Sequence, residues 1–240
     1  MGWECRDVDI VNASSDPSGP GQHDLTSEAL WRSLIADVEA GAFRFVFMGT
    51  PCETFSVARN GPPGPRALRS AEHRYGLPKG QLTPAEADQV SLGTYFALQS
   101  ARIADTASAC GVPWALENPE PRHNPVSLFL LPEFVALAKA PGVQQTDFDQ
   151  CSFGAASTKP TRILGKGVSF GRIQGRCQHP KTWQSWTGRT GSREEGRVAH
   201  PPLVGKDSSG RYKTHAAAAY PAALNQVLAE AITATSPGVQ

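Results

Sequence analysis

The chain alternates between stretches in which apolar residues recur every three or four positions and short apolar runs that end at Gly or Pro. Short runs of this kind are typical of β-strands. The run at residues 43–48 is rich in phenylalanine and lies between Gly41 and Gly49, so it predicts a buried strand. Strands are predicted at residues 1–12, 43–48, 113–116, 144–148 and 162–164.

The periodic stretches predict helices. The clearest helix begins at Thr83-Pro84-Ala85-Glu86, where a capping box and a proline in the first turn open a long helix that ends at Gly111. A helix capped by Thr26 or Ser27 is predicted to run to Ala40, and further helices are predicted at residues 84–110, 127–140 and 215–233. Strands that alternate with helices predict an α/β protein with a mostly parallel sheet.

Residues 165–212 interrupt this alternation, because they lack apolar periodicity and are rich in Gly, Arg, Trp and His. They predict a small irregular basic subdomain between an α/β domain at residues 1–164 and a C-terminal helical segment at residues 213–240 that packs back on it. Residues 159–213 hold 12 basic and 3 acidic residues, a net charge of +9, so the remainder carries −8. This asymmetry predicts a polyanionic partner, with a solvated surface loop as the alternative.

Composition excludes several classes of protein. Hydrophobic residues make up 40% of the 240 residues and charged residues 19%, which is typical of a soluble globular protein. No apolar run is long enough to cross a bilayer, and the N-terminus lacks a signal-peptide pattern, so no membrane partner is predicted. The five cysteines form no even, closely spaced framework. We therefore expect an intracellular protein, in the nucleus if the source is eukaryotic and otherwise in the cytoplasm.

Two reactive side chains follow predicted strands. Cys52 comes just after residues 43–48, and Glu117 comes directly after residues 113–116. The carboxyl ends of strands in an open α/β sheet are where ligands bind, so the two side chains face one crevice if their strands are neighbours. Cys52 is either a nucleophile or a small buried hydrophobic residue. Residues 57–82, rich in Gly, Pro and Arg, predict a long functional or mobile loop.

Four sequence blocks occur in a familiar order: Thr50-Pro51-Cys52-Glu53-Thr54-Phe55-Ser56, Leu116-Glu117-Asn118-Pro119, Lys159-Pro160-Thr161-Arg162 and the helix that begins at Tyr220-Pro221. Together they resemble a cytosine-5 DNA methyltransferase, whose signatures are a Pro-Cys loop followed by Phe-Ser and a Glu-Asn-Val or Glu-Asn-Pro loop. The resemblance covers most of residues 1–164 and the last helix. It implies a Rossmann-like sheet.

The chain departs from this family at three points. The family's Gly-rich cofactor loop, Phe-x-Gly-x-Gly, does not occur in residues 1–240, so we expect a divergent relative whose sheet is truncated at its first strand. Thr50 stands where the family usually has Pro. The sequence Lys-Pro-Thr-Arg at residues 159–162 stands where the family has Gln-x-Arg-x-Arg.

The resemblance implies methylation of cytosine C5 in DNA with S-adenosylmethionine as the cofactor. Cys52 would add to carbon 6 of the base, and Glu117 would bind the exocyclic amine and ring nitrogen 3. Arg162 would steer the base or a phosphate, and its alternative is a surface arginine. A base in a duplex must leave the stack, and the arginine-rich loop at residues 57–82 would close over it.

The resemblance also implies binding residues. Asp9 would accept hydrogen bonds from the ribose hydroxyls of the cofactor and Asp24 from its adenine amine, although either could be an ordinary turn or strand-end acid. The cofactor-binding set is Asp9, Asp24 and Pro51, and the substrate-binding set is Ser56, Arg59, Asn118 and Lys159. For Asn118 the favoured alternative is a turn residue that bonds to the backbone and shapes the loop. Residues 165–212, with Trp183 and Trp186, occupy the place of the target-recognition region.

Three other functions stay open. A nucleic-acid-binding remnant without turnover would bind DNA but no cofactor, and an RNA cytosine-5 methyltransferase would share the same loops. A cysteine hydrolase would need a histidine base, for which His73 and His123 are the candidates. No metal site is predicted, because Cys177, His179 and His200 fall one ligand short of a four-ligand zinc site.

Overall fold

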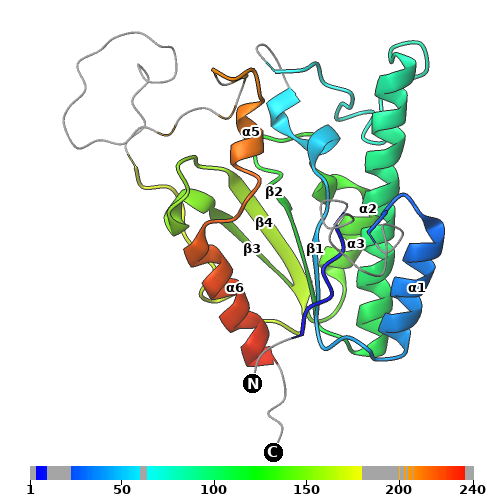
Figure 1. The fold of residues 1–240 in the computed structure, drawn as a ribbon, viewed down its shortest axis with the longest axis vertical. Helices are drawn as coiled ribbons and strands as arrows, with labels where there is room; N and C mark the ends of the chain where they lie inside the picture. Colours follow the sequence, from blue (N-terminus) through cyan, green and yellow to red (C-terminus); the bar gives the residue numbers. More distant parts are fainter. Residues whose placement is uncertain are drawn as a thin grey trace, which may run out of the picture.

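The sheet of this protein has four strands and is covered by helices on both faces (Figure 1). The computed structural model describes residues 4–9, 23–59, 64–179, 200, 203, 205–206 and 208–235. The strands are β1 (Val46–Gly49), β2 (Trp114–Pro119), β3 (Val143–Asp149) and β4 (Pro160–Lys166). Their order is β1-β2-β4-β3, with β1 parallel to β2 and both other pairings antiparallel. The α/β class is confirmed, but the sheet is mixed rather than mostly parallel.

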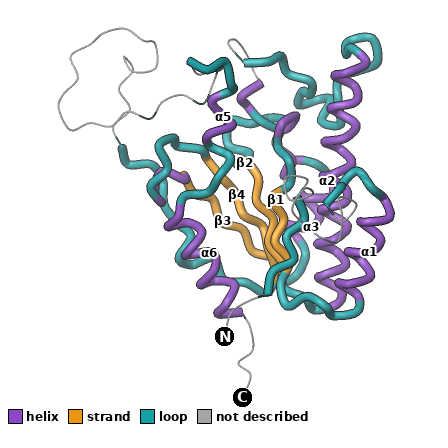
Figure 2. The backbone as a smooth tube through the Cα atoms, in the orientation of Figure 1, coloured by secondary structure: helices purple, strands orange, loops and turns teal. Residues whose placement is uncertain are grey.

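Two helical layers enclose the sheet (Figure 2). The helices are α1 (Glu28–Glu39), α2 (Pro84–Cys110), α3 (Pro132–Lys139), α5 (Lys213–Ala216) and α6 (Ala222–Thr235). The described residues also form four short 3₁₀ helices: η3 (Glu53–Phe55), η4 (Val57–Arg59), η5 (Leu128–Leu130) and η6 (Gln150–Phe153). The first core cluster packs α2 and α3 on one face of the sheet, and the second packs α6 on the other.

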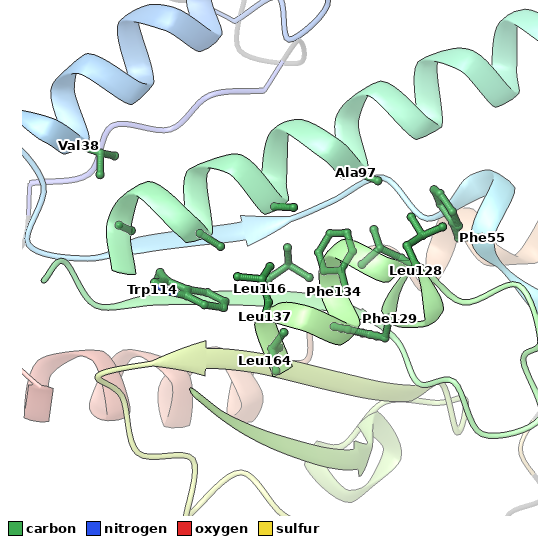
Figure 3. Packing of buried hydrophobic residues seen from close by; sticks show 14 of the residues in the cluster. Val38, Phe55, Ala97, Trp114, Leu116, Leu128, Phe129, Phe134, Leu137 and Leu164 are labelled. Atoms are coloured by element: carbon green, nitrogen blue, oxygen red, sulfur yellow. The ribbon is translucent and has the colours of Figure 1, made fainter. Parts of the chain in front are cut away.

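Residues of β2 alternate between these two cores. Trp114 and Leu116 pack against α2 and α3, as Figure 3 shows, whereas Ala115 belongs to the core under α6. Successive side chains of a strand point to opposite faces. Glu117 therefore follows Ala115 onto the α6 face, and Asn118 follows Leu116 onto the α2 face.

Local signals at the helix ends match the structure. Thr83 and Glu86 form a capping box, in which the Thr83 hydroxyl accepts from the Glu86 N–H at 3.3 Å and Glu86 accepts from the Thr83 N–H at 2.9 Å. The helix ends at Cys110 because Gly111 adopts a left-handed conformation with φ of 71°. Ser27 likewise caps α1. These predicted helix boundaries are confirmed.

Other predictions need correction. Residues 4–9 hold no strand, and among the described residues β1 pairs only with β2, so it lies at the edge of the sheet. Its burial is partial, and Phe47 is 37% exposed. The predicted helix at residues 215–233 is two helices, because the chain breaks between α5 and α6. Among the described helices, none combines the length and the apolar character that a membrane span requires.

Candidate functional site

The loop after β1 is fixed on both sides. The Asn118 side-chain amide donates a hydrogen bond of 2.7 Å to the Thr50 carbonyl, and the Thr50 hydroxyl lies 2.8 Å from the Ser100 hydroxyl of α2. Asn118 is fully buried, so this bond ties the loop to the neighbouring strand. Cys52 follows as the residue before η3, where it is half-buried. Asn118 thus shapes the loop, which matches its interpretation as a structural residue.

A buried arginine holds the far side of the loop. Arg69 is 2% exposed, and its guanidinium donates to the Thr54 hydroxyl at 3.1 and 2.9 Å and lies 3.8 Å from the centre of the Phe55 ring. It also donates to oxygens of Val90 and Thr94 in α2. Burial lowers the pKa of Arg69 to about 10. The loop that presents Cys52 is therefore a rigid element attached to α2.

Glu117 lies beside the end of β1. The register pairs Gly49 with Glu117, so the carboxyl group stands next to the point where the chain turns toward Cys52. Its side chain is 8% exposed, and Oε2 accepts a hydrogen bond of 2.8 Å from the Tyr220 hydroxyl. The buried Oε1 accepts no hydrogen bond from the described residues. Burial raises the pKa of Glu117, although Lys159 and the Tyr220 hydrogen bond oppose this shift.

Cys52 and Glu117 interact electrostatically. Burial raises the pKa of Cys52 and the negative charge of Glu117 adds to this shift, whereas the positive charge of Lys159 opposes it; the resulting pKa is about 11. The Lys159 ammonium lies 5.5 Å from the centre of the Tyr220 ring. Lys159 has an unusual backbone, with φ of 35°, which non-glycine residues adopt at a cost and often at functional sites. We call Cys52, Glu117, Lys159 and Tyr220 the Cys52 cluster.

The Cys52 cluster combines three chemical capacities. It offers a thiol, a buried carboxyl group with a raised pKa that can donate a proton, and an ammonium group that favours the thiolate. The groups that shift the Cys52 pKa are Glu117, Lys159 and Glu53, with no histidine among them. Within the described part of the chain, no histidine is therefore among the charged groups that act on the thiol, although the cysteine hydrolase alternative would require one.

A cavity of about 500 Å³ lies beside the outer edge of β1. Residues 6–9 and Pro51 line it together with β1, α1, α2 and Tyr220. Arg6 holds the N-terminal segment against α1 through an ion pair of 2.6 Å with Asp37. Of the three predicted cofactor-binding residues, Asp9 and Pro51 line this cavity. Asp24 instead accepts hydrogen bonds from the Thr26 N–H and hydroxyl, which lower its pKa.

Arg162 lies apart from the Cys52 cluster. It is paired with Asn118 in the register, which places it on the α2 face, opposite Glu117. Its guanidinium forms two hydrogen bonds, of 2.6 and 2.7 Å, with the Asp147 carboxylate and lies 5.6 Å from the centre of the Phe129 ring. In this structure Arg162 connects β4 to β3 rather than joining Cys52 and Glu117.

In the predicted substrate-binding loop, polar side chains form hydrogen bonds and ion pairs with other residues of the chain. Arg59 donates to the Glu53 carbonyl, the Arg66 carbonyl and the Gln89 side chain, and the Ser56 hydroxyl accepts from the Ala58 N–H at 3.2 Å. Arg66 pairs with Glu86, and Arg69 is buried. Trp183 and Trp186 lie outside the described residues. Within the described part of the basic segment, Arg172 and Arg176 pair with Glu230 and Glu120.

The sequence analysis missed two residues of this region. Tyr220 was noted only as the start of the last helix, yet its hydroxyl completes the Cys52 cluster. Its distance of 103 residues from Glu117 left no local signal. Arg69 lies in the loop at residues 57–82, for which the sequence predicts a functional or mobile role, whereas its burial makes it a structural support. Comparison of the chain with protein-family models, curated proteins and solved structures finds no match.

Proposed function

We propose that this chain methylates carbon 5 of cytosine in DNA, with Cys52 forming a covalent bond to the base. The observation that carries the proposal is the buried contact between β1 and β2, which brings the thiol of Cys52 and the carboxyl group of Glu117 within electrostatic reach of each other. The buried Oε1 of Glu117 supports it, because this atom has no hydrogen-bond partner among the described residues and can therefore bind a ligand.

The chemistry needs a sulfur nucleophile and a proton donor in one place. Addition of the Cys52 sulfur to carbon 6 leaves carbon 5 rich in electrons, provided that ring nitrogen 3 receives a proton. Glu117 supplies that proton, and the raised pKa of its carboxyl group favours the protonated form. The proton released by the Cys52 thiol passes to the Glu117 carboxylate, and Lys159 stabilises the negative charge on the sulfur. In the balance, the S–H bond breaks while the S–C6 and N3–H bonds form.

The cavity beside β1 fits a cofactor in size and in the residues that line it. Ligand cavities measure about 300–1,000 Å³, and this one of about 500 Å³ reaches from Asp9 to Pro51, next to the Cys52 loop. The Asp9 carboxylate would accept from vicinal hydroxyl groups. When bound there, S-adenosylmethionine would supply an electrophilic methyl group. Asp24 does not line the cavity and drops out of the proposed cofactor set.

The finer fold assignment belongs to the same proposal. A Rossmann-like sheet that lacks its first strand would keep a parallel pair of strands and would expose an outer edge where the missing strand would pair. The parallel pairing of β1 with β2 and the position of the cavity at the outer edge of β1 support this assignment.

Trapping with a mechanism-based substrate tests the proposal. Cytosine that carries fluorine at carbon 5 cannot lose that substituent, so the covalent adduct accumulates. We expect duplex DNA with 5-fluorocytosine to give a denaturation-resistant complex with the wild-type chain and S-adenosylmethionine, and none with Cys52→Ser. Cys110→Ser is the matched control, because Cys110 is exposed at the end of α2.

Each outcome of this experiment decides the proposal. An adduct that persists in Cys52→Ser would exclude Cys52, and no adduct with the wild-type chain on either DNA or RNA would exclude the reaction. An adduct on tRNA but not on duplex DNA would identify an RNA methyltransferase. Readout by denaturing gel and by mass spectrometry of the Cys52 peptide distinguishes these results.

A second candidate is a nucleic-acid-binding protein without turnover. The observation that favours it is the raised Cys52 pKa of about 11, which keeps the thiol protonated at neutral pH in this structure. Titration calorimetry separates the two candidates. The binding protein would give heat with DNA and none with S-adenosylmethionine, whereas the enzyme would bind both.

A further inference from the structure

Four potential metal ligands, none of which belongs to the Cys52 cluster, meet at the end of the sheet near β3. Cys151 lies in η6, Cys177 and His179 follow β4, and His200 comes from a later part of the chain. The ligand atoms of these four side chains all lie within 4.8 Å of one another. We propose that Cys151, Cys177, His179 and His200 bind one zinc ion.

The separations between the ligand atoms fit a tetrahedral ion. Zinc binds sulfur at about 2.3 Å and imidazole nitrogen at about 2.0 Å, so the edges of a tetrahedral site measure about 3.3–3.8 Å. The Cys177 sulfur lies 3.6 Å from the His179 Nδ1, and that nitrogen lies 3.1 Å from the His200 Nε2. The largest separation, 4.8 Å, exceeds such an edge by about 1 Å, which small side-chain rotations would close.

Neighbouring groups already orient the ligands. The His200 Nδ1 lies 2.7 Å from the Ala156 carbonyl, which fixes the tautomer that leaves Nε2 free to bind metal. The Cys177 N–H donates a bond of 2.8 Å to the Asp149 carboxylate. These are the kinds of outer contact that hold metal ligands in place.

A close backbone approach brings the two cysteines together. Gly175 forms a bridge with Phe148 at φ of 144°, and a side chain at Gly175 would come within 2.8 Å of the Ser152 Cβ. Glycine therefore lets the segment that carries Cys177 lie against η6, which carries Cys151. The arrangement is built into the backbone and does not depend on flexible side chains alone.

The ligand set indicates the metal and its role. Two thiolates and two imidazoles match zinc, and four protein ligands leave no open position for water or substrate. The site is therefore structural. The ion would connect Cys151 of η6 with Cys177 and His179. Because His200 is the fourth ligand, the ion would also link the residues before and after residues 180–199. The sequence analysis counted three ligands because Cys151 lies 26 positions before Cys177.

Metal content of the whole chain tests the proposal. We expect the chain, purified under reducing conditions from a zinc-supplemented culture, to hold about one zinc per molecule by mass spectrometry of the elements. Cys177→Ser and His200→Asn should reduce this content at least about tenfold. Cys110→Ser and His73→Asn are the matched controls, since neither residue belongs to the set, and they should keep the wild-type content.

Conservative replacement guards against variants that simply fail to fold. His179→Cys keeps a zinc ligand and should retain most of the metal, whereas His179→Asn should lose it. Cobalt substituted for zinc should show a thiolate-to-metal absorption band that weakens in Cys151→Ser. A wild-type chain without zinc, or variants of Cys177 and His200 that keep the wild-type content, would overturn the proposal.

Discussion

Glu117 combines two properties that folded proteins seldom show at one residue: a buried oxygen that no described residue hydrogen-bonds, and a raised carboxyl pKa. Both cost stability, and both make the residue suited to donate a proton to a ligand. The charge of this one carboxyl group also acts on Cys52. The reactivity of the thiol is therefore a property of the pair.

Glu117→Gln should lower the Cys52 pKa below its value of about 11. The variant keeps the size of the side chain and an oxygen that can accept from Tyr220, but it removes the negative charge that disfavours the thiolate. We expect the rate of Cys52 alkylation at a fixed alkaline pH to rise several-fold. The measurement is the pH profile of iodoacetamide labelling, followed on the Cys52 peptide by mass spectrometry.

Glu53→Gln is the matched control, because Glu53 is the weakest of the charges that act on Cys52 and is exposed. It should change the labelling rate less than Glu117→Gln does. Equal rates in the wild-type chain and Glu117→Gln would show that the two side chains are not coupled.

Glu117→Gln should also change how the free energy of unfolding depends on pH. The folded pKa of Glu117 is raised above its ordinary value of 4.5, so protonation favours the folded state. This contribution is fully present below about pH 4.5 and is lost as pH rises through the folded pKa. The wild-type chain should therefore lose stability relative to Glu117→Gln above that range, as measured by urea unfolding at several pH values.

The convergence of Cys52 and Glu117 could be anticipated from the sequence, because each follows a strand and parallel neighbours end at the same edge. The position of Arg162 could not. A shift of one residue in register moves a side chain to the opposite face of a sheet, and the sequence does not specify the register between β2 and β4. Cys151 was missed for a related reason, since only the fold brings η6 to Cys177.

At the scale of elements, α2 and the Cys52 loop fit against each other at Gly93. A methyl group at this position would lie 2.6 Å from the Thr54 hydroxyl and 3.3 Å from the Arg69 guanidinium. Arg69 holds that hydroxyl with two hydrogen bonds, so it cannot move aside freely. The absence of a side chain at Gly93 therefore sets how closely the loop approaches the helix.

Gly93→Ala should destabilise the protein, although alanine favours helices over glycine by about 1 kcal/mol. Overpacking against the buried Thr54 and Arg69 should outweigh this gain and give a net loss of about 1–2 kcal/mol. The measurement is the free energy of unfolding in urea. Ser91→Ala, at an exposed position of the same helix, is the control and should stabilise by about 0.5 kcal/mol. A gain in stability for Gly93→Ala would contradict this packing.

Helix ends were predictable wherever a local signal decides them, as at Thr83 and Gly111. To predict the break between α5 and α6, the position of a proline has to be considered together with apolar periodicity. Pro221 disfavours a helical conformation for the residue before it, so Tyr220 interrupts the helix that apolar periodicity alone predicts. Polar and apolar residues largely alternate in residues 4–9, which predicts a strand. A strand needs a hydrogen-bonded partner strand, and among the described residues β1, which lines the same cavity as residues 6–9, pairs only with β2.

At the scale of the molecule, the helical layers on the two faces of the sheet have different roles. The α2 face supplies the larger core and the anchoring of the Cys52 loop, and the α6 face supplies the setting of Glu117. The mixed topology was not predictable from the order of elements, because β4 enters between β2 and β3 as an antiparallel strand. Strand order depends on contacts between residues far apart in the sequence.

A chain that ends at Gly210 should not fold cooperatively. It loses α6, whose buried Leu224 and Leu228 cover Ala115 and Ile163 of the sheet. Burial of a leucine contributes about 1.5–3 kcal/mol, so the loss exceeds about 3 kcal/mol from a typical total of about 5–15 kcal/mol. We expect a broad thermal transition and binding of a hydrophobic dye.

The control ends at Thr235, the last residue of α6, and should unfold like the complete chain. Cooperative unfolding of the shorter chain at the wild-type temperature would show that the sheet does not depend on α6.

The hydrogen bond between Tyr220 and Glu117 spans 103 residues, which has a consequence for biosynthesis. While the ribosome is still making the residues between Glu117 and Tyr220, the carboxyl group of β2 exists without the phenol that binds it. The carboxyl group therefore gains its hydrogen-bond donor only after Tyr220 has been made, and a nascent polypeptide that stops before Tyr220 carries Cys52 and Glu117 without this contact.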